Sequence, residues 1–92
     1  MTKILVIQPE LSNNSIFIKL LELEGFNIIV SENAVGGLCK AQSELPDLII
    51  SDIIMPELDG YSLLKALRES PITAIIPFIF LTSEVSQSQI RK

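Results

Sequence analysis

The sequence contains no histidine, no tryptophan and a single cysteine, Cys39. One thiol cannot form an internal disulfide, and without histidine no Cys/His set exists for a structural metal. Basic residues are also scarce: seven Lys and Arg against eleven Asp and Glu give a net charge of −4. The basic residues are scattered rather than clustered, which argues against direct binding to nucleic acid, because phosphates require a concentrated positive surface.

Long hydrophobic runs are absent as well. The longest apolar stretch, Ala74 to Leu81, is interrupted by Pro77 and is far shorter than the roughly 20 residues of a membrane-spanning helix. Near the N-terminus, Lys3 is followed by only four apolar residues, too few for the core of a signal peptide. We therefore expect a cytoplasmic protein with no membrane association.

What the chain does have is 48% hydrophobic residues in 92 positions, which is enough for a core and argues against disorder. The length fits one domain, residues 1–92. Apolar runs bounded by polar residues predict four strands, and these are Lys3–Ile7, Phe26–Ser31, Asp47–Asp52 and Phe78–Leu81.

Helical patterns follow each predicted strand. They cover residues 13–24, 34–44 and 60–69, and the opening turns of a fourth helix at 86–92. Strands that alternate with helices through short connections predict a parallel α/β sheet with right-handed crossovers. The natural arrangement is a doubly wound, flavodoxin-like sheet with strand order 2-1-3-4.

The helix ends carry recognisable signals. Ser12 or Asn13 can cap the first helix, and Gly25 ends it in a left-handed conformation. Asn33 and Asp59 can cap the next two.

Two of these helices have unusual compositions. Gly36-Gly37 lies inside the second, which should therefore be weak, at roughly 1 kcal/mol per glycine relative to alanine. In the first helix one stripe contains Ile16, Phe17, Leu20 and Leu23, but Ile18 and Leu21 lie off it, so this helix is apolar over more than one face.

The most informative stretch is Asp47–Gly60, DLIISDIIMPELDG. A buried strand here ends in the carboxylate of Asp52, in the crevice where open parallel sheets bind ligands. Taken alone, an acid at a strand end is weak evidence for chemistry. The nearby polar residues have simple structural interpretations: Asp59 as a helix cap, Glu57 as a solvated loop charge, and Tyr61 as a half-buried helix residue.

The segment PDLIISDIIMPELDGYSLLKALR resembles the phosphoacceptor region of bacterial response regulator receiver domains. The similarity extends through KILVI, LLELEGF, the SENA turn and IPFIFLTSE, so it spans essentially the whole chain. The D-x-x-M-P-x-x-D-G pattern between a strand and a helix is specific to this family. The resemblance implies a two-component signalling module that accepts a phosphoryl group from a histidine kinase or phosphotransfer protein and acts on an output domain or partner protein.

The resemblance also implies residue roles. Asp52 matches the phosphoacceptor, and an ionised carboxylate is a competent nucleophile for in-line phosphoryl transfer. Thr82 matches the hydroxyl that bonds a phosphoryl oxygen, and Ser83 the small residue beside it. The backbone carbonyl of Ile54, together with Asp52, matches ligands of the family's Mg²⁺. Met55-Pro56 and Gly60 match the loop that shapes the site.

Two features depart from the family pattern. The pair of acids that ends the family's first strand reads Gln8-Pro9 here, with Glu10 one place later as a weak substitute. Gln8 offers Mg²⁺ only a neutral carbonyl oxygen and Pro9 no side-chain ligand. The other departure is length, because a fifth strand and helix, roughly thirty residues, are missing from the pattern together with the family's lysine and aromatic switch residue.

These departures leave two functions open: a working phosphoacceptor module, or a degenerate receiver that binds proteins without phosphotransfer. A third class, enzymes of the haloacid dehalogenase type, needs a second acid two residues after the nucleophile, where this chain has Ile54. We therefore expect no enzyme of that kind. An uncovered fourth strand would be an apolar sheet edge, which predicts a homo-oligomer.

Overall fold

The computed structural model describes residues 2–9, 15–55 and 57–81. Within them the chain alternates strand and helix: β1 Lys3–Ile7, α1 Ser15–Leu23, β2 Asn27–Ser31, α2 Ala34–Glu44, β3 Leu48–Asp52, α3 Gly60–Glu69 and β4 Phe78–Leu81. The proposed cap at Ser12 or Asn13 and the fourth helix at 86–92 lie outside the described residues.

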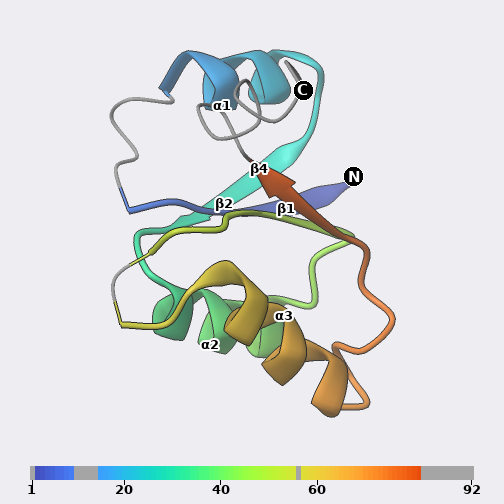
Figure 1. Ribbon diagram of the computed structural model, residues 1–92. Helices are drawn as coiled ribbons and strands as arrows, with labels where there is room; N and C mark the ends of the chain where they lie inside the picture. The colour runs from blue at the N-terminus through green and yellow to red at the C-terminus, as the bar shows by residue number, and fades with distance from the viewer. Residues whose placement is uncertain (1, 10–14, 56, 82–92) are drawn as a thin grey trace, which may run out of the picture.

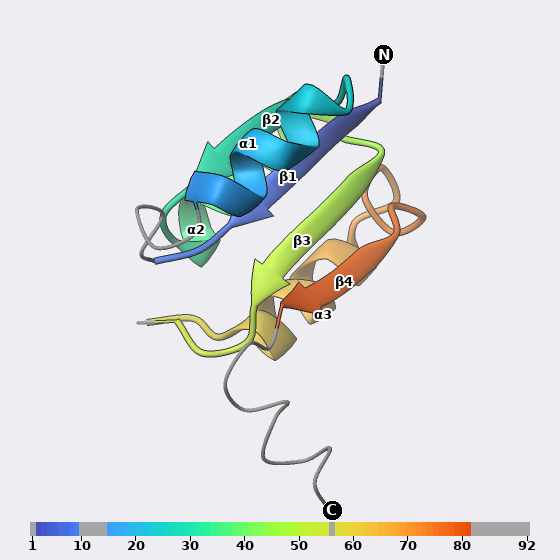
Figure 2. The same ribbon diagram turned by 90° about the horizontal axis from the view of Figure 1, so that it is seen from above.

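All four strands are parallel and lie in the order β2-β1-β3-β4, as the sequence predicts (Figures 1 and 2). Figure 1 shows three layers, with α1 on one side of the sheet and α2 and α3 on the other. This is the doubly wound arrangement, in which crossovers cover both faces of the sheet. Consequently β1, at the centre, is almost completely buried from Ile4 to Ile7.

Each face of the sheet has its own core. The α2/α3-side core is a cluster of nine buried residues that come from two strands (β1 and β3), two connecting segments and both helices, and it includes Leu5, Ile49 and Leu63. The α1-side core has three buried residues, Ile4, Val6 and Ile50, with partly buried side chains around them. The two cores alternate along each strand because successive side chains point to opposite faces.

Two strands begin one residue later than predicted. Phe26 belongs to the turn that closes α1, since its N–H donates to Leu21 O at 3.2 Å. Asp47 precedes β3, and its carboxylate accepts a hydrogen bond from Lys3 N at 2.8 Å. The Asp47 N–H still donates to Lys3 O at 2.8 Å, so hydrogen bonding between β1 and the β3 segment begins one residue before the strand itself.

The predicted stripe on α1 is wrong in three of its four positions. Ile16, Leu20 and Leu23 are 75%, 56% and 76% exposed. The side chains of Phe17 and Leu21, one turn apart, pack on the α1-side core instead. The expectation that this helix is apolar over more than one face is confirmed, and for that reason its periodicity does not determine which face is buried.

The predicted caps at Gly25, Asn33 and Asp59 are confirmed. Gly25 has φ 97, in the left-handed region, and Asn33 Oδ1 accepts a hydrogen bond from Gly36 N at 2.6 Å. Within α2, Gly37 lies against Ile7, where an added Cβ would clash with the isoleucine side chain. The glycine that lowers intrinsic helix propensity therefore also lets α2 approach the central strand.

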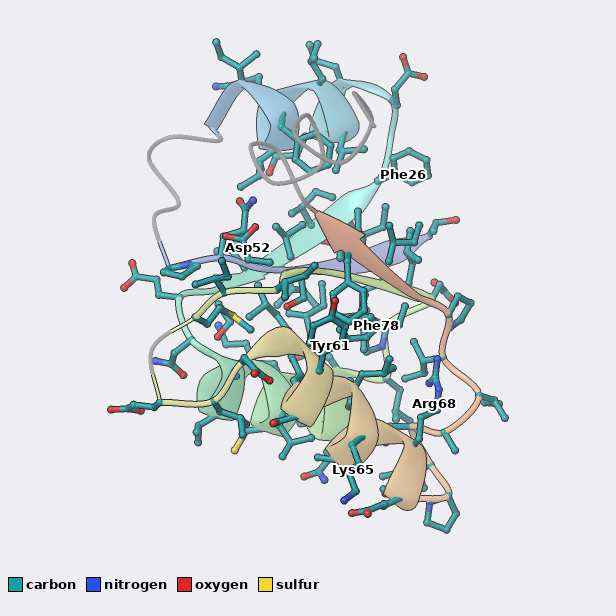
Figure 3. The ribbon with its side chains drawn as sticks, viewed as in Figure 1. Phe26, Asp52, Tyr61, Lys65, Arg68 and Phe78 are labelled. Atoms are coloured by element: carbon teal, nitrogen blue, oxygen red, sulfur yellow. The ribbon has the colours of Figure 1, made fainter. Side chains whose placement is uncertain are left out.

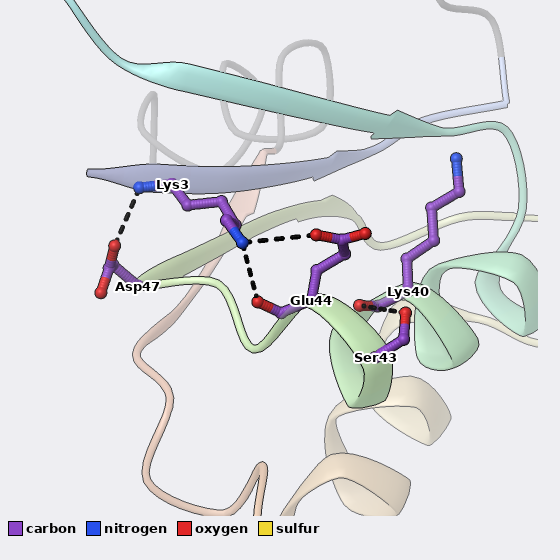
Figure 4. Close-up of polar contacts among 5 residues, drawn as sticks. All are labelled: Lys3, Lys40, Ser43, Glu44 and Asp47. Atoms are coloured by element: carbon purple, nitrogen blue, oxygen red, sulfur yellow. Dashed lines mark hydrogen bonds and ion pairs between the residues drawn. The ribbon is translucent and has the colours of Figure 1, made fainter. Parts of the chain in front are cut away.

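Polar contacts secure the end of the sheet where the strands begin (Figure 4). Lys3 Nζ contacts Glu44 Oε1 at 3.3 Å and the Glu44 carbonyl at 3.1 Å. Together with the bond from Lys3 N to Asp47, these contacts join β1 to the end of α2 and the start of β3. The ion pair is partly exposed and contributes little to stability, and this end of the sheet lies opposite Asp52.

Candidate functional site

Asp52 is the last residue of β3, at the carboxyl edge of the sheet. Asp52 lies two residues after Ile50, which belongs to the α1-side core, and residues two apart on a strand share a face. Its side chain therefore faces α1 rather than α2 and α3. Figure 3 shows the Asp52 side chain on that side of the sheet. The residue is half-buried at this edge of the sheet.

Gln8 is the neighbour of Asp52 on β1. Register pairs Ile7 with Ser51, so Gln8 follows beside Asp52. Its N–H donates to Ser31 O at 2.9 Å and extends the β1–β2 ladder by one residue. Through the same alternation that places Ile4 and Val6, the Gln8 side chain lies on the α1 side, the face that carries Asp52.

The Gln8 carboxamide is buried without hydrogen bonds. The residue is 1% exposed, and neither Nε2 nor Oε1 has a partner. An unsatisfied buried polar group costs about 1–3 kcal/mol, and buried polar side chains are normally bonded. This amide therefore needs an explanation that packing alone does not supply.

The loop after Asp52 is fixed from the opposite face. Ser51 Oγ donates to Asp52 O at 2.9 Å and lies 3.9 Å from Met55 Sδ. Met55 is 7% exposed and belongs to the α2/α3-side core. Farther along, Glu57 has φ 71, an uncommon left-handed conformation for a residue other than glycine, and its side chain is exposed, as predicted.

Gly60 is where this loop returns to β3. Its N–H donates to Ile53 O at 2.7 Å. A Cβ at this position would lie 2.5 Å from the Asp52 carbonyl oxygen and 2.9 Å from Ile53 Cα. Glycine is therefore required by the close approach of α3 to the backbone of Asp52.

Asp59 is the N-cap of α3, as the sequence predicts. Its Oδ1 accepts a hydrogen bond from Ser62 N at 2.8 Å. This bond from Ser62 to the ionised carboxylate is the main cause that lowers the pKa of Asp59 from its ordinary value of 3.8. The capping role accounts for Asp59 without any part in ligand binding.

Three aromatic rings line the sheet beside α3. Tyr61 and Phe80 have ring centroids 5.0 Å apart, and Phe78 and Phe80 are 5.1 Å apart in an edge-to-face arrangement. Figure 3 shows Tyr61 and Phe78 beneath the sheet, on the side opposite Asp52. Tyr61 is 59% exposed, so the prediction that it is half-buried is wrong.

The structure brings together only part of the predicted site. Asp52 and Gln8 lie side by side, and Ile54 follows two residues later with an exposed side chain. Glu10, Thr82 and Ser83 lie outside the described residues. In the part of the chain that is described, no three His, Cys, Asp or Glu side chains gather as a metal site would require, and no helix there is long and apolar enough to span a membrane.

Sequence patterns missed three features of this site. The burial of Gln8 could have been inferred, because an extended β1 ladder puts it next to the Asp52 strand. The close approach at Gly60 also has a signal, the glycine directly after a cap residue. The left-handed Glu57 has none, since glutamate is not a residue that favours positive φ.

Comparison with known proteins identifies the family. A model described as the response regulator receiver domain matches residues 4–92. The chain is 45% identical over 71 residues to histidine kinase P4 of Formosa agariphila, covering 77% of this chain and 5% of that protein. It is 35% identical over 82 residues to the alkaline phosphatase synthesis transcriptional regulatory protein PhoP of Bacillus subtilis, covering 89% of this chain and 33% of that protein.

Solved structures agree with this result. The chemotaxis protein CheY4 of Vibrio cholerae superposes with a TM-score of 0.85 at 28% identity, over 99% of this chain and 76% of the other. The chain spans a third or less of the two curated relatives above. The chain therefore belongs to the family of response regulator receiver domains.

Proposed function

We propose that this receiver domain accepts a phosphoryl group on Asp52 and signals through a change in conformation. The observation that carries the proposal is the delivery of one half-buried carboxylate to the carboxyl edge of a parallel sheet, next to a loop held by Met55 and Gly60. Open α/β sheets bind ligands at this edge. The donor is a histidine kinase or phosphotransfer protein, and the readout is an output domain or partner protein.

The chemistry follows from the carboxylate. One Asp52 oxygen forms a bond to phosphorus while the P–N bond of a donor phosphohistidine breaks, and the freed imidazole nitrogen takes its proton from solvent. The acyl phosphate adds negative charge next to Gln8 and the β3–α3 loop. A charge of this kind shifts a two-state domain toward the conformation in which it is better bonded, and in this chain we assign such bonding to Thr82, with Ser83 leaving space beside it.

The residues present fit Mg²⁺ poorly. Mg²⁺ prefers carboxylate oxygens in near-octahedral geometry. Asp52 is the acid at the end of β3, whereas Gln8 beside it is neutral and Pro9 has no side-chain ligand. Glu32, directly after β2, is exposed, and no three acids gather among the described residues. The remaining candidate ligands are the Ile54 carbonyl and Glu10, so we assign no step of the transfer to a metal.

The second candidate function is a degenerate receiver that binds partners without phosphotransfer. The neutral Gln8 amide beside Asp52 favours this function, because an amide binds Mg²⁺ less well than a carboxylate does. Without the cation, less positive charge would stabilise an incoming phosphoryl group. Both candidates belong in the cytoplasm. Both also allow self-association through β4, the last strand of the described sheet, whose Ile79 is 51% exposed.

The deciding experiment uses a small phosphodonor. The protein is incubated with acetyl phosphate and Mg²⁺ and analysed by intact mass spectrometry, with Asp52→Asn as control. Phosphotransfer predicts the added mass of one phosphoryl group in the wild type and none in the variant. An unlabelled wild type, under conditions that label an ordinary receiver domain in parallel, would instead establish the degenerate function.

A further inference from the structure

We propose that Gln8 sets the cation affinity of the Asp52 site. Its neutral carboxamide stands where a carboxylate would bind a divalent cation, so the wild-type site binds Mg²⁺ only weakly. A single substitution, Gln8→Glu, would therefore create a Mg²⁺ site. The inference concerns the site of the proposed function, but its test measures binding and does not depend on phosphorylation.

The first step of the argument is position. The β1–β3 register and the extra ladder bond from Gln8 N to Ser31 O place the Gln8 side chain on the same face as Asp52, on the adjacent strand. Side chains at neighbouring positions on adjacent strands have Cβ atoms roughly 5 Å apart. A cation bound by Asp52 would therefore be within reach of the side chain at position 8.

The second step is the state of that side chain. Gln8 is 1% exposed and neither polar atom is bonded. An apolar side chain would fill this position without the cost of an unbonded amide. A buried amide with a free donor and a free acceptor therefore indicates that a polar ligand binds here. The unpaired amide thus points independently to a ligand position between β1 and β3.

The third step is charge. Asp52 is the carboxylate that β3 brings to this point, and the Gln8 side chain beside it is neutral. A second carboxylate at position 8 would attract the cation strongly at this separation, since coulombic energy is large in a partly desolvated site. Glutamate has nearly the same shape as glutamine, so Gln8→Glu changes the charge and little else. We expect Mg²⁺ affinity to rise by about tenfold or more.

The test is isothermal titration calorimetry with Mg²⁺ on wild type and Gln8→Glu, supported by thermal unfolding with and without millimolar Mg²⁺. The expected result is weak or undetectable binding and a constant Tm for wild type, against clear binding and a Mg²⁺-dependent rise in Tm for the variant. Gln42→Glu, the same change at an exposed position on α2, is the matched control and should leave Mg²⁺ binding unchanged.

Three outcomes decide the proposal. Wild type that binds Mg²⁺ as tightly as Gln8→Glu overturns it, as does a folded Gln8→Glu with no gain. If Gln8→Glu does not fold, Gln8→Asp is titrated by the same protocol, and the wild-type affinity by itself remains decisive: submillimolar binding contradicts the proposal. A gain that disappears in Gln8→Glu/Asp52→Asn supports it, whether or not Asp52 is phosphorylated.

Discussion

The cores on the two faces of this sheet differ in their number of buried residues, and residues of the candidate site belong to both faces. On the α2/α3 side, nine buried residues from strands, helices and connecting segments form one cluster. On the α1 side the hydrophobic cluster of the described residues has only three buried members, Ile4, Val6 and Ile50. We call the α1 side, with its small core, the thin side, and the α2/α3 side the thick side. Asp52 and Gln8 face the thin side, whereas Met55 and Leu63 belong to the core of the thick side.

The residues that support the site and the residues that would contact a ligand therefore lie on opposite faces of the sheet. A densely packed core resists rearrangement, so it holds Met55 after β3 and Leu63 on α3 in place. The thinner side has fewer buried contacts to lose, and low local contact density is where proteins rearrange most easily. We therefore expect core substitutions on the thick side to affect folding first, and changes on the thin side to affect the site first.

The largest effect should come from matched leucine truncations. Leu63→Ala on α3 removes a side chain with 0% exposure from the thick core and should lower the free energy of unfolding by about 3–5 kcal/mol. Leu21→Ala on α1 removes a partly buried side chain from the thin core and should lower it by about 1–2 kcal/mol. Urea denaturation measures both.

Leu20→Ala, at a 56% exposed position on the same helix, is the control, and its effect should stay within about 0.5 kcal/mol. Equal losses for Leu63→Ala and Leu21→Ala would contradict the contrast between the two faces.

Gly60→Ala should have the next largest effect. The new Cβ would meet the Asp52 carbonyl oxygen and Ile53 Cα, both backbone atoms that cannot move aside independently. We expect a loss of about 1–3 kcal/mol and a displaced α3 N-terminus. Tyr61 is the only tyrosine in a chain without tryptophan. Its ring lies at a tilt against Phe80, which also borders Gly60, so its fluorescence should change.

Gly25→Ala supplies the comparison for that experiment. Gly25 has φ 97 but nothing within 4 Å of an added Cβ. The Gly25→Ala variant should therefore lose stability through backbone strain, while its Tyr61 fluorescence stays as in wild type. If both variants shift the fluorescence equally, Gly60 has no special relation to the site.

The sequence predicted the thick side well and the thin side incompletely. Strand order follows from four apolar runs and short crossovers, and the caps at Asn33 and Asp59 depend only on local hydrogen bonds. The third helix, predicted over 60–69, is observed as α3 over Gly60–Glu69. In α1, by contrast, apolar residues surround the helix, so periodicity does not distinguish Leu20 from Leu21, and tertiary packing decides. The unpaired Gln8 amide depends on contacts between distant segments, which no local pattern encodes.

The unbonded amide of Gln8 should lower the free energy of unfolding, and removing it should have a smaller effect than the glycine substitutions. Gln8→Met keeps an unbranched side chain of similar length and removes both unsatisfied polar atoms. We expect the free energy of unfolding to rise by about 1 kcal/mol, measured by urea denaturation. Gln42→Met, at an exposed position, should leave stability within about 0.5 kcal/mol. A loss of stability in Gln8→Met would mean that the amide is bonded in solution.

The smallest effect should be the pH dependence of the α3 cap. The pKa of Asp59 in the folded protein lies below its ordinary value of 3.8, because Ser62 N–H stabilises the ionised carboxylate. The folded state therefore binds the proton less readily than the unfolded state. The resulting stabilisation is fully present above the unfolded pKa and is lost as pH falls through the folded pKa.

Asp59→Asn isolates this contribution, since asparagine also caps helices but does not titrate. The difference in Tm between wild type and Asp59→Asn should be constant from neutral pH down to about pH 5 and should change in favour of the variant below pH 4. Glu57→Gln, at an exposed loop position two residues earlier, is the control and should track wild type. A difference that stays constant through pH 3 would show that the bond from Ser62 does not distinguish the two charge states of Asp59, and that the cap stabilises α3 through geometry alone.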